Sequence, residues 1–208
     1  MELTVIDKKG KATSKKVKLS DAVFGVTPND HAIYLDVKQY LANQRQGTSK
    51  ARERSEIRGS RRKIRKQKGS GGARFGDIKN PLFRGGGRVF GPRPKEHGFK
   101  LNKKLKQVAR KSALSLMASE KSITIIEDLK FDAIKTGSYV EFLNNLNLSE
   151  KKTLLVLNEL DKNIYLSSRN LKGAKVIIAS ELSTYGILNA NNLLLSESSV
   201  ATIEKSLS

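Results

Sequence analysis

The sequence contains no cysteine among its 208 residues. Disulfide bonds, thiolate metal sites and cysteine nucleophiles are therefore excluded, and this absence is consistent with an intracellular protein. No apolar run approaches the roughly 18 residues that a membrane-spanning helix needs. Glu2 and Asp7 interrupt the first apolar positions, so this segment does not have the pattern of a secretory signal. We therefore expect a soluble, cytoplasmic protein that does not enter a membrane.

Motifs that bind nucleotide phosphates are missing as well. The pattern G-x-x-x-x-G-K-[ST] does not occur, and G-x-G-x-x-G fails because Arg74 stands where the glycine after Gly69 and Gly71 would be needed. These glycines also do not lie between a predicted strand and its following helix, where a phosphate would meet a helix N-terminus. We therefore expect no nucleotide cofactor.

Positive charge is abundant and unevenly distributed. The chain has 40 lysines and arginines against 20 acids, a net charge of +20 at pH 7, which attracts polyanions. Between Arg45 and Lys111 there are 23 bases and four acids, so this third of the chain carries a net charge of +19. The apolar fraction is 38%, which indicates that part of the chain does not contribute to a core. Nucleic acid is the first candidate partner, and an anionic membrane surface is the second.

The basic third has no helical or strand periodicity over residues 47–99 and holds 11 of the 16 glycines. A loop of this length is uncommon and is usually functional or disordered. Its composition cannot bury enough apolar surface to offset chain entropy, so we expect it to be disordered alone and ordered by a partner. Its 53 residues could extend about 85 Å, counted out and back.

Helices are predicted on both sides of this loop. The first follows the N-cap Asn29 and reaches Gly47 as a C-terminal stop, and the second follows Asn102. The positions at helical spacing are Ile33, Val37, Tyr40 and Leu41 in the first helix and Leu105, Val108, Ala109, Ser112 and Leu116 in the second. Both ends of the loop are therefore anchored in folded structure, so the loop is an insertion arm and not a tail.

The rest of the chain alternates between strands and helices. Apolar runs typical of strands buried on both faces occur at 123–126, 154–157, 176–179 and 193–195. Helices are predicted at 137–146, with Thr136 or Ser138 as the cap, at 161–170 and at 198–207. This pattern predicts an α/β fold with a doubly wound, mainly parallel sheet, flanking helices and an edge hairpin of 3–6 with 15–19. We expect the α/β domain to comprise 1–46 and 101–208, and the extended basic loop 47–100.

The arm combines three residue types that together favour RNA. Arginine offers a planar fork to phosphate and can stack on bases, and glycine lets the backbone approach RNA closely. Phenylalanine is costly in an exposed loop unless it stacks on a base or packs in a pocket, and the stacking candidates are Phe75, Phe83, Phe90 and Phe99. The predicted RNA-binding bases are Arg45, Lys50, Arg52, Arg54, Arg58, Arg61, Arg62, Lys63, Arg65, Lys66, Lys68, Arg74, Lys79, Arg84, Arg88, Arg93, Lys95, Lys100, Lys103 and Lys104. An arm of this reach is better suited to the interior of a folded RNA than to the surface of a DNA duplex.

Few side chains could carry out catalysis or hold a metal ion. His31 and His97 have no second ligand or nucleophile at a useful spacing, so a surface or packing role for His31 and an RNA contact for His97 are favoured. Glu127 and Asp128 follow a predicted strand, where an α/β enzyme could place acids, but no base or metal ligand is near. A solvated strand end is the better interpretation. The sequence thus predicts a non-catalytic protein without metal or cofactor.

The order of short motifs resembles that of a known family. The segments are Arg45-Gln46-Gly47-Thr48, Gln67-Lys68-Gly69-Ser70-Gly71 with Ala73-Arg74, Pro81, Arg84-Gly85-Gly86-Gly87, Phe90, Gly91-Pro92-Arg93-Pro94 and Asn102-Lys103-Lys104. They are similar to those of the bacterial form of large-ribosomal-subunit protein four, the universal uL-four family. The likeness extends along the chain to Glu159-Leu160-Asp161 and Ser168-Arg169-Asn170-Leu171.

The resemblance implies a structural component of the large ribosomal subunit that binds rRNA early in assembly. In the family, the α/β domain lies outside and the loop runs inward through 23S-type rRNA to the wall of the polypeptide exit tunnel. The tip would then consist of Gln67, Lys68, Gly69, Ser70 and Gly71. The implied partners are rRNA, neighbouring ribosomal proteins including the other protein of the tunnel constriction, and the nascent peptide. No homo-oligomer, membrane or cofactor is implied.

One departure from the family lies at the tip. Lys63 and Ile64 stand where many bacterial members have proline and tryptophan. We therefore expect the surface toward the tunnel to differ, while the anchoring to RNA does not.

Two other classes of function compete with this one. An RNA-directed enzyme would use the α/β domain for catalysis and the arm as a clamp, but it requires a cofactor or metal motif that is missing. A membrane-surface protein would need an amphipathic helix or a lipid anchor as a second signal, and the sequence offers neither.

Overall fold

The computed structural model describes residues 1–207, which form two compact units. The first, named the α/β unit, consists of Met1–Leu41 together with the chain from Lys100 onward. The second, named the arm, is Ala42–Phe99. The sequence predicts 47–100 for the same loop.

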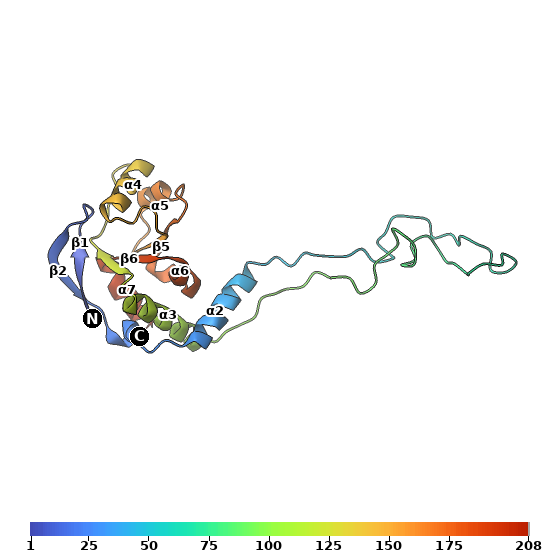
Figure 1. Cartoon of the computed structure of the whole chain (residues 1–208), viewed down its shortest axis with the longest axis horizontal. Coiled ribbons are helices and arrows are strands. Elements are labelled where there is room, and N and C mark those ends of the chain that lie inside the picture. The colour runs from blue at the N-terminus through green and yellow to red at the C-terminus, as the bar shows by residue number, and fades with distance from the viewer. Residues whose placement is uncertain (208) are drawn as a thin grey trace. The chain divides into compact units, whose positions relative to one another are not determined.

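Six strands form one sheet in the order β2-β1-β3-β6-β4-β5 (Figure 1). β1 pairs antiparallel with β2, and all other neighbouring strands are parallel. The strands are β1 Glu2–Ile6, β2 Ala12–Lys18, β3 Ile123–Ile126, β4 Thr153–Leu157, β5 Ala174–Ile178 and β6 Asn192–Ser196. The predicted α/β class, the mainly parallel sheet and the edge hairpin are therefore confirmed.

The central strands are apolar on both faces. All five residues of β4 are buried: Leu154 and Val156 belong to one core cluster, and Leu155 and Leu157 belong to the other. Continuous apolar runs of this kind are typical of parallel sheets that helices cover on both faces. β2 forms the edge and is largely exposed, and its three lysines disfavour pairing with a further strand.

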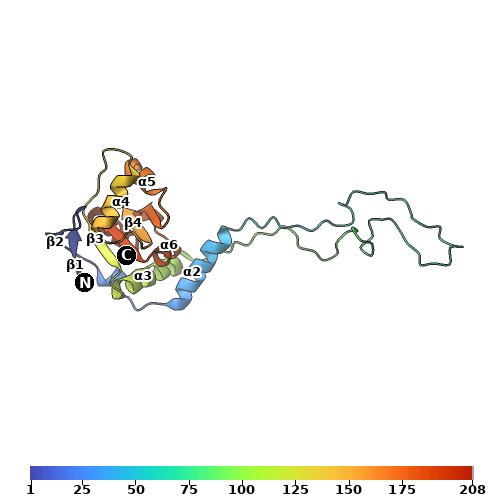
Figure 2. The ribbon, with the colours of Figure 1, turned by 45° about the horizontal axis from the view of Figure 1, so that its top comes forward.

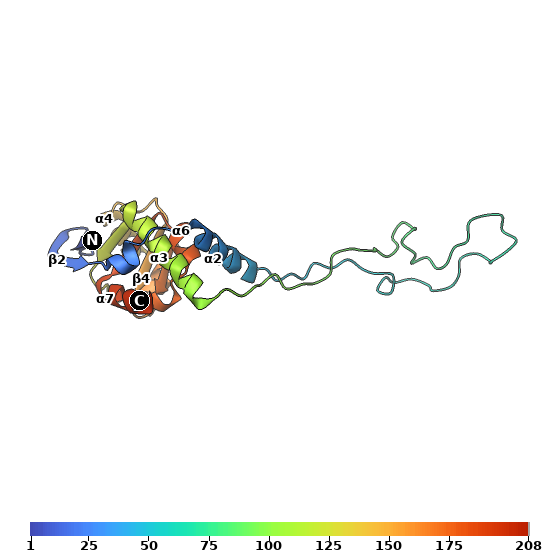
Figure 3. The same cartoon turned by 90° about the horizontal axis from the view of Figure 1, so that it is seen from below.

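Helices cover the sheet in two layers. α1, α3, α6 and α7 contribute to the larger core cluster on one face, and α4 and α5 pack around Tyr139 on the other face. Figure 2 shows α4 and α5 away from α3. Figure 3 views the molecule from the side of α3 and α7. The helices are α1 Asp21–Phe24, α2 Asp30–Asn43, α3 Lys103–Ser119, α4 Thr136–Asn145, α5 Lys162–Ser168, α6 Thr184–Asn189 and α7 Glu197–Leu207, with a 3-10 turn at Ala179–Glu181.

The predicted cap Asn29 is present, and the structure adds a second side-chain cap at Asp161. The Asn29 side chain accepts a hydrogen bond from the Ala32 N–H at 3.0 Å, at the start of α2. The Asp161 carboxylate accepts from the Asn163 N–H at 2.8 Å, at the start of α5. Each bond satisfies a backbone donor that has no partner within the helix, which fixes where the helix begins.

Other predicted helix ends are wrong. α2 ends at Asn43 and not at Gly47, which lies in the arm with φ at 66°. α4 has no side-chain cap, so the prediction of Thr136 or Ser138 fails. Asn102 does precede α3, but its side chain makes no capping hydrogen bond.

The buried face of α3 is rotated from the predicted one. Its buried residues are Ala109, Ser112, Ala113, Leu114, Ser115, Met117 and Ala118. Val108 is exposed, and Leu105 and Leu116 are only half-buried, which corrects the prediction. The hydroxyls of Ser112 and Ser115 accept from backbone N–H groups of Asn29 and Val26, both at 3.1 Å. The small residues of α3 thereby fix the segment that leads into α2, the helix from which the arm departs.

Candidate RNA interface

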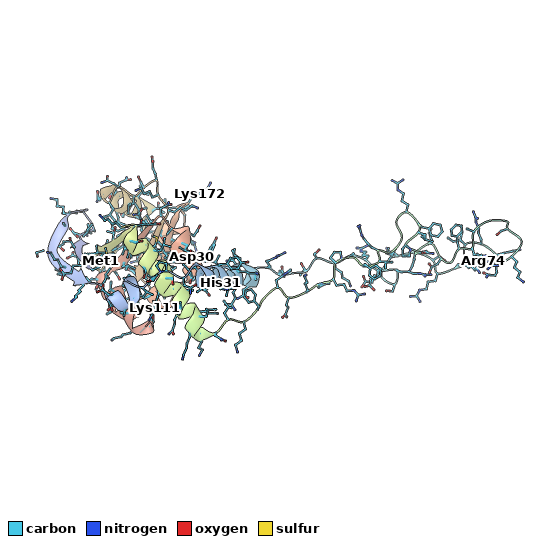
Figure 4. The ribbon with its side chains drawn as sticks, turned by 60° about the horizontal axis from the view of Figure 1, so that its bottom comes forward. Met1, Asp30, His31, Arg74, Lys111 and Lys172 are labelled. Atoms are coloured by element: carbon cyan, nitrogen blue, oxygen red, sulfur yellow. The ribbon has the colours of Figure 1, made fainter. Side chains whose placement is uncertain are left out.

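The arm consists of two antiparallel runs joined by backbone hydrogen bonds: the outgoing run precedes residues 67–71, and the returning run follows them. The arm contains no helix or strand between residues 44 and 99. Backbone N–H groups of one run donate to carbonyl oxygens of the other. The Lys95 N–H donates to the Gly47 oxygen (3.1 Å), and the Ala51 N–H donates to the Pro92 oxygen (2.9 Å). The Arg88 N–H donates to the Arg52 oxygen (2.9 Å), and the Ile64 N–H donates to the Gly76 oxygen (3.0 Å). Figure 4 labels Arg74 close to the turn between the runs. The arm is therefore a cross-linked loop and not two independent chains.

Three of the four acids in this segment are paired with its own bases. The ion pairs are Arg54–Asp77 at 2.9 Å, Arg93–Glu53 at 2.5 Å and Lys50–Glu56. The hydrogen bond from Lys50, followed by the backbone N–H of Glu53, lowers the pKa of Glu56. The Asp77 side chain is only 12% exposed, so its pair is the most shielded of the three. The acids thus hold the runs of the arm in place instead of facing solvent alone.

Nearly all the predicted RNA-binding bases are exposed. Lys79 is the exception, with 8% exposure, and its side chain lies beside Gly59 within the arm. Lys103 and Lys104 occupy the first turn of α3, where positive charge is unfavourable beside the helix dipole and an anionic neighbour would relieve it. The remaining bases are spread along both runs, so the arm presents positive charge over its length.

The four candidate stacking residues differ in their surroundings. The rings of Phe75 and Phe83 lie 5.2 Å apart, and the guanidinium of Arg65 lies 5.2 Å from the Phe75 ring centre. These two rings therefore pack on each other within the arm. Phe90, by contrast, is fully exposed, and Phe99 is 37% exposed.

The predicted tip is exposed at every position. Gln67, Lys68, Gly69, Ser70 and Gly71 all face solvent, and the Lys63 ammonium donates to the Gln67 side chain. Ile64, which precedes the tip, is 47% exposed. The tip thus carries short polar side chains and an available ammonium group at Lys68.

The two histidines have different environments. His31 stacks on Tyr34 with ring centres 6.4 Å apart on the exposed surface of α2. Desolvation, followed by the positive charges of Arg45 and Lys95, lowers the pKa of His97. The positive charges of the arm thus disfavour a further charge on the imidazole of His97.

Glu127 and Asp128 have structural partners. Glu127 pairs with Lys15 at 3.7 Å, and the Asp128 carboxylate accepts from the Ser198 hydroxyl at 2.7 Å in the first turn of α7. Within residues 1–207, no group of three or more histidine and acidic side chains could hold a metal ion. Across the same range, none of the helices has the length and apolar content to cross a membrane.

A second group of bases escaped sequence reasoning. Lys8, Lys9, Lys130 and Lys135 line a hollow of about 380 Å³ in the α/β unit, together with Asp132, Glu141 and other residues. The first two lysines come from the β1–β2 turn and the others from the segment before α4. Because these segments are far apart in the sequence, no local pattern could have brought them together.

Neutralising Asp77 is expected to weaken RNA binding although it makes the chain more positive. Asp77→Asn removes the partner of Arg54 and loosens the arm, which should lower the affinity for rRNA about three- to tenfold, as for a pair worth about 1 kcal/mol. Filter binding at 0.1 M salt would measure this. Glu96→Gln is the matched control, because Glu96 has no ion pair in the described part of the chain. Glu96→Gln should bind rRNA as tightly as the unmodified chain or more tightly. Tighter binding by Asp77→Asn than by the unmodified chain would contradict the prediction.

Together the fold and the arm define a class of protein: an α/β domain with an internal, cross-linked basic extension. Residues 17–206 match the model of the ribosomal protein L4/L1 family, and the chain belongs to this family.

Several relatives align with this chain over the full length of both proteins. The large ribosomal subunit protein uL4 of Christiangramia forsetii is 62% identical over 208 residues, covering 100% of both chains. The proteins of the same name from Flavobacterium johnsoniae and Phocaeicola vulgatus are 60% and 57% identical, also over 100% of both chains. Membership in a family of ribosomal proteins confirms the resemblance inferred from the arm motifs, and it confirms that the chain is not an enzyme.

Proposed function

We propose that this chain is a structural component of the large ribosomal subunit, acting in the cytoplasm, and that its arm binds large-subunit rRNA. The observation that carries the proposal is the arm itself. Its bases are exposed along both runs, while three of its acids are engaged in internal ion pairs. Phosphate is the ligand that such a surface attracts most strongly. The full-length likeness to proteins named as large-subunit components supports the same assignment.

The proposed contacts follow the arm from its base to its turn. Exposed arginines and lysines of both runs of the arm bind phosphates. In the α/β unit, Lys100 before α3 and Lys103 and Lys104 in its first turn bind phosphates as well. Lys79 is left out as a direct contact because it is buried. The residues from Gln67 to Gly71 form the tip, which we assign to the wall of the polypeptide exit tunnel. Neighbouring large-subunit proteins and the nascent peptide are the further partners.

Early binding during subunit assembly is part of the proposal. Each phosphate contact releases condensed counterions, so about ten contacts give a slope of log affinity against log salt of roughly −7 to −9. Binding of this kind is fast and strong at low salt. It suits a protein that captures RNA segments before other proteins cover them.

A high-salt sucrose gradient of cell lysate, probed for this protein, tests the assignment. We expect the protein to sediment with the large ribosomal subunit and to leave that fraction only after nuclease digestion. Sedimentation as a free small protein before digestion would contradict the proposal. A protein that stays in rapidly sedimenting material after complete digestion of the RNA would also contradict it.

A further inference from the structure

The returning run of the arm contains a bulge of three residues. The Arg88 N–H donates to the Arg52 oxygen and the Ala51 N–H donates to the Pro92 oxygen, both at 2.9 Å. Ala51 and Arg52 are neighbours on the outgoing run, but their partners Pro92 and Arg88 are four positions apart on the returning run. The three intervening residues, from Val89 to Gly91, form no backbone hydrogen bond with the outgoing run, which is the pattern of a bulge.

The bulge presents apolar side chains to solvent. Phe90 is fully exposed, and Val89 beside it is 56% exposed. Phe90 also has a φ of 57°, a left-handed conformation that a bulky side chain rarely adopts. An exposed aromatic ring and a strained backbone are both unfavourable in the free protein. A strained residue of this kind is a reason to look for a function.

Close packing beneath the bulge explains why it points outward. A Cβ on Gly91 would lie 2.4 Å from the Ala51 Cβ, and a Cβ on Gly87 would lie 2.5 Å from the Arg54 nitrogen. The two runs therefore touch at both glycines and leave no room for side chains between them. The side chains of the bulge have only the solvent side available.

Arginines line a hollow next to the bulge. The hollow has a volume of about 600 Å³, and its lining includes Arg54, Arg88, Arg93, Glu53 and Phe90. Arg54 and Arg93 are paired with Asp77 and Glu53, whereas Arg88 has no ion-pair partner in residues 1–207. The bulge thus offers the flat apolar ring of Phe90 and, two residues away, the guanidinium of Arg88, whose charge no described acid neutralises.

We infer that Phe90 stacks on an unpaired base of RNA while Arg88 binds a neighbouring phosphate. Every base has a flat face for a ring and is linked to a phosphate, which matches the two groups on the bulge. A regular RNA helix does not provide this ligand, because its bases are already stacked on one another. Phe75 and Phe83 pack together and are not equivalent to Phe90. The inference rests on the proposed function, since it names the nucleotide state that the arm recognises.

The experiment uses the full chain and deproteinised large-subunit rRNA. Phe90→Ala should reduce the affinity about tenfold at every salt concentration, because a lost stacking contact is not ionic and leaves the salt slope unchanged. Arg88→Gln should instead reduce the magnitude of the slope by about 0.7 to 0.9. Phe90 belongs to neither core cluster, so thermal unfolding of the α/β unit should not change.

A fluorescent variant makes the stacking visible. The chain contains no tryptophan, so Phe90→Trp introduces a single reporter. We expect this variant to bind rRNA as tightly as the unmodified chain and its fluorescence to be quenched on binding. Leu82→Trp is the matched control, because Leu82 is an arm residue with 80% exposure outside the bulge. Its fluorescence should change much less.

The outcomes separate the two proposals. Unchanged affinity of Phe90→Ala, with no quenching of Phe90→Trp while the unmodified chain still binds rRNA, would overturn the stacking inference and leave the proposed function intact. Enhanced, blue-shifted tryptophan fluorescence that occurs only in assembled particles would place the ring in an apolar pocket of a protein, which also overturns it. Failure of the unmodified chain to bind rRNA would instead remove the proposed function.

Discussion

Replacing residues 48–94 by Asn-Gly should leave the α/β unit folded and reduce its affinity for large-subunit rRNA by at least about a thousandfold at 0.2 M salt. Gly47 and Lys95 are hydrogen-bonded across the runs, so a two-residue hairpin turn can join them without moving either end. The excised segment carries 15 bases and three acids, and its loss lowers the net charge from +20 to +8. The slope of log affinity against log salt should fall to a small fraction of its original value.

Both cores lie outside the excised segment, which is why the fold should persist. Every residue of the two core clusters belongs to the α/β unit. Circular dichroism and a thermal unfolding curve would check the fold, and filter binding over a series of salt concentrations would check the affinity. A shortened chain that unfolds would show that the arm supports the domain. A shortened chain that keeps both the affinity and the steep salt dependence would remove the arm from the RNA interface.

Gly87→Ala should disrupt the arm far more than its size suggests. The added Cβ would lie 2.5 Å from the nitrogen and 2.6 Å from the Cα of Arg54, and these backbone atoms cannot rotate away as a side chain can. The two runs would have to separate, which breaks the bond from the Arg88 N–H to the Arg52 oxygen. We expect the affinity for rRNA to fall at least about tenfold, equivalent to about 1.4 kcal/mol.

Gly76→Ala is the matched control for this substitution. Gly76 also lies in the arm, but a Cβ there would meet only the end of the Arg54 side chain at 3.5 Å. Its carbonyl, which accepts from the Ile64 N–H, is unaffected by the change. This variant should bind rRNA within about twofold of the unmodified chain, a difference of less than 0.5 kcal/mol. Equal affinities of the two variants would show that the close approach at Gly87 does not matter for binding.

The sheet was predictable because its signal is local. The run 154–157 is apolar at every position and the run 123–126 at all but Thr124, and a strand covered on both faces needs little more than that. The cap Asn29 was predictable for the same reason, since it acts within three residues of itself. The location of the proposed RNA interface was inferred from charge alone, because electrostatic attraction to phosphate depends on composition more than on geometry.

The errors and omissions have a common cause in tertiary contacts. α1 and α6 span four and six residues, which is too short for helical periodicity to be recognised. The rotation of the buried face of α3 follows from its packing against α1, α6 and α7. The ladder of the arm joins residues up to 48 positions apart, as between Gly47 and Lys95, and no sequence pattern marks it. The burial of Lys79 depends on this pairing of the two runs, so the density of positive charge in the sequence could not predict it.

The arm has no free end, since its two runs leave and re-enter the same α/β unit. A tail can be drawn through a finished ring of RNA, because a single strand passes first and the rest follows. A closed loop can pass only as a doubled strand, with arginine side chains projecting from both runs at once. For a narrow ring, the simpler order is that the ring closes around the loop. If RNA encircles the arm, as the proposed function requires, its segments must complete their folding after the protein has bound. The connectivity of the chain would then impose an order in time on its surroundings.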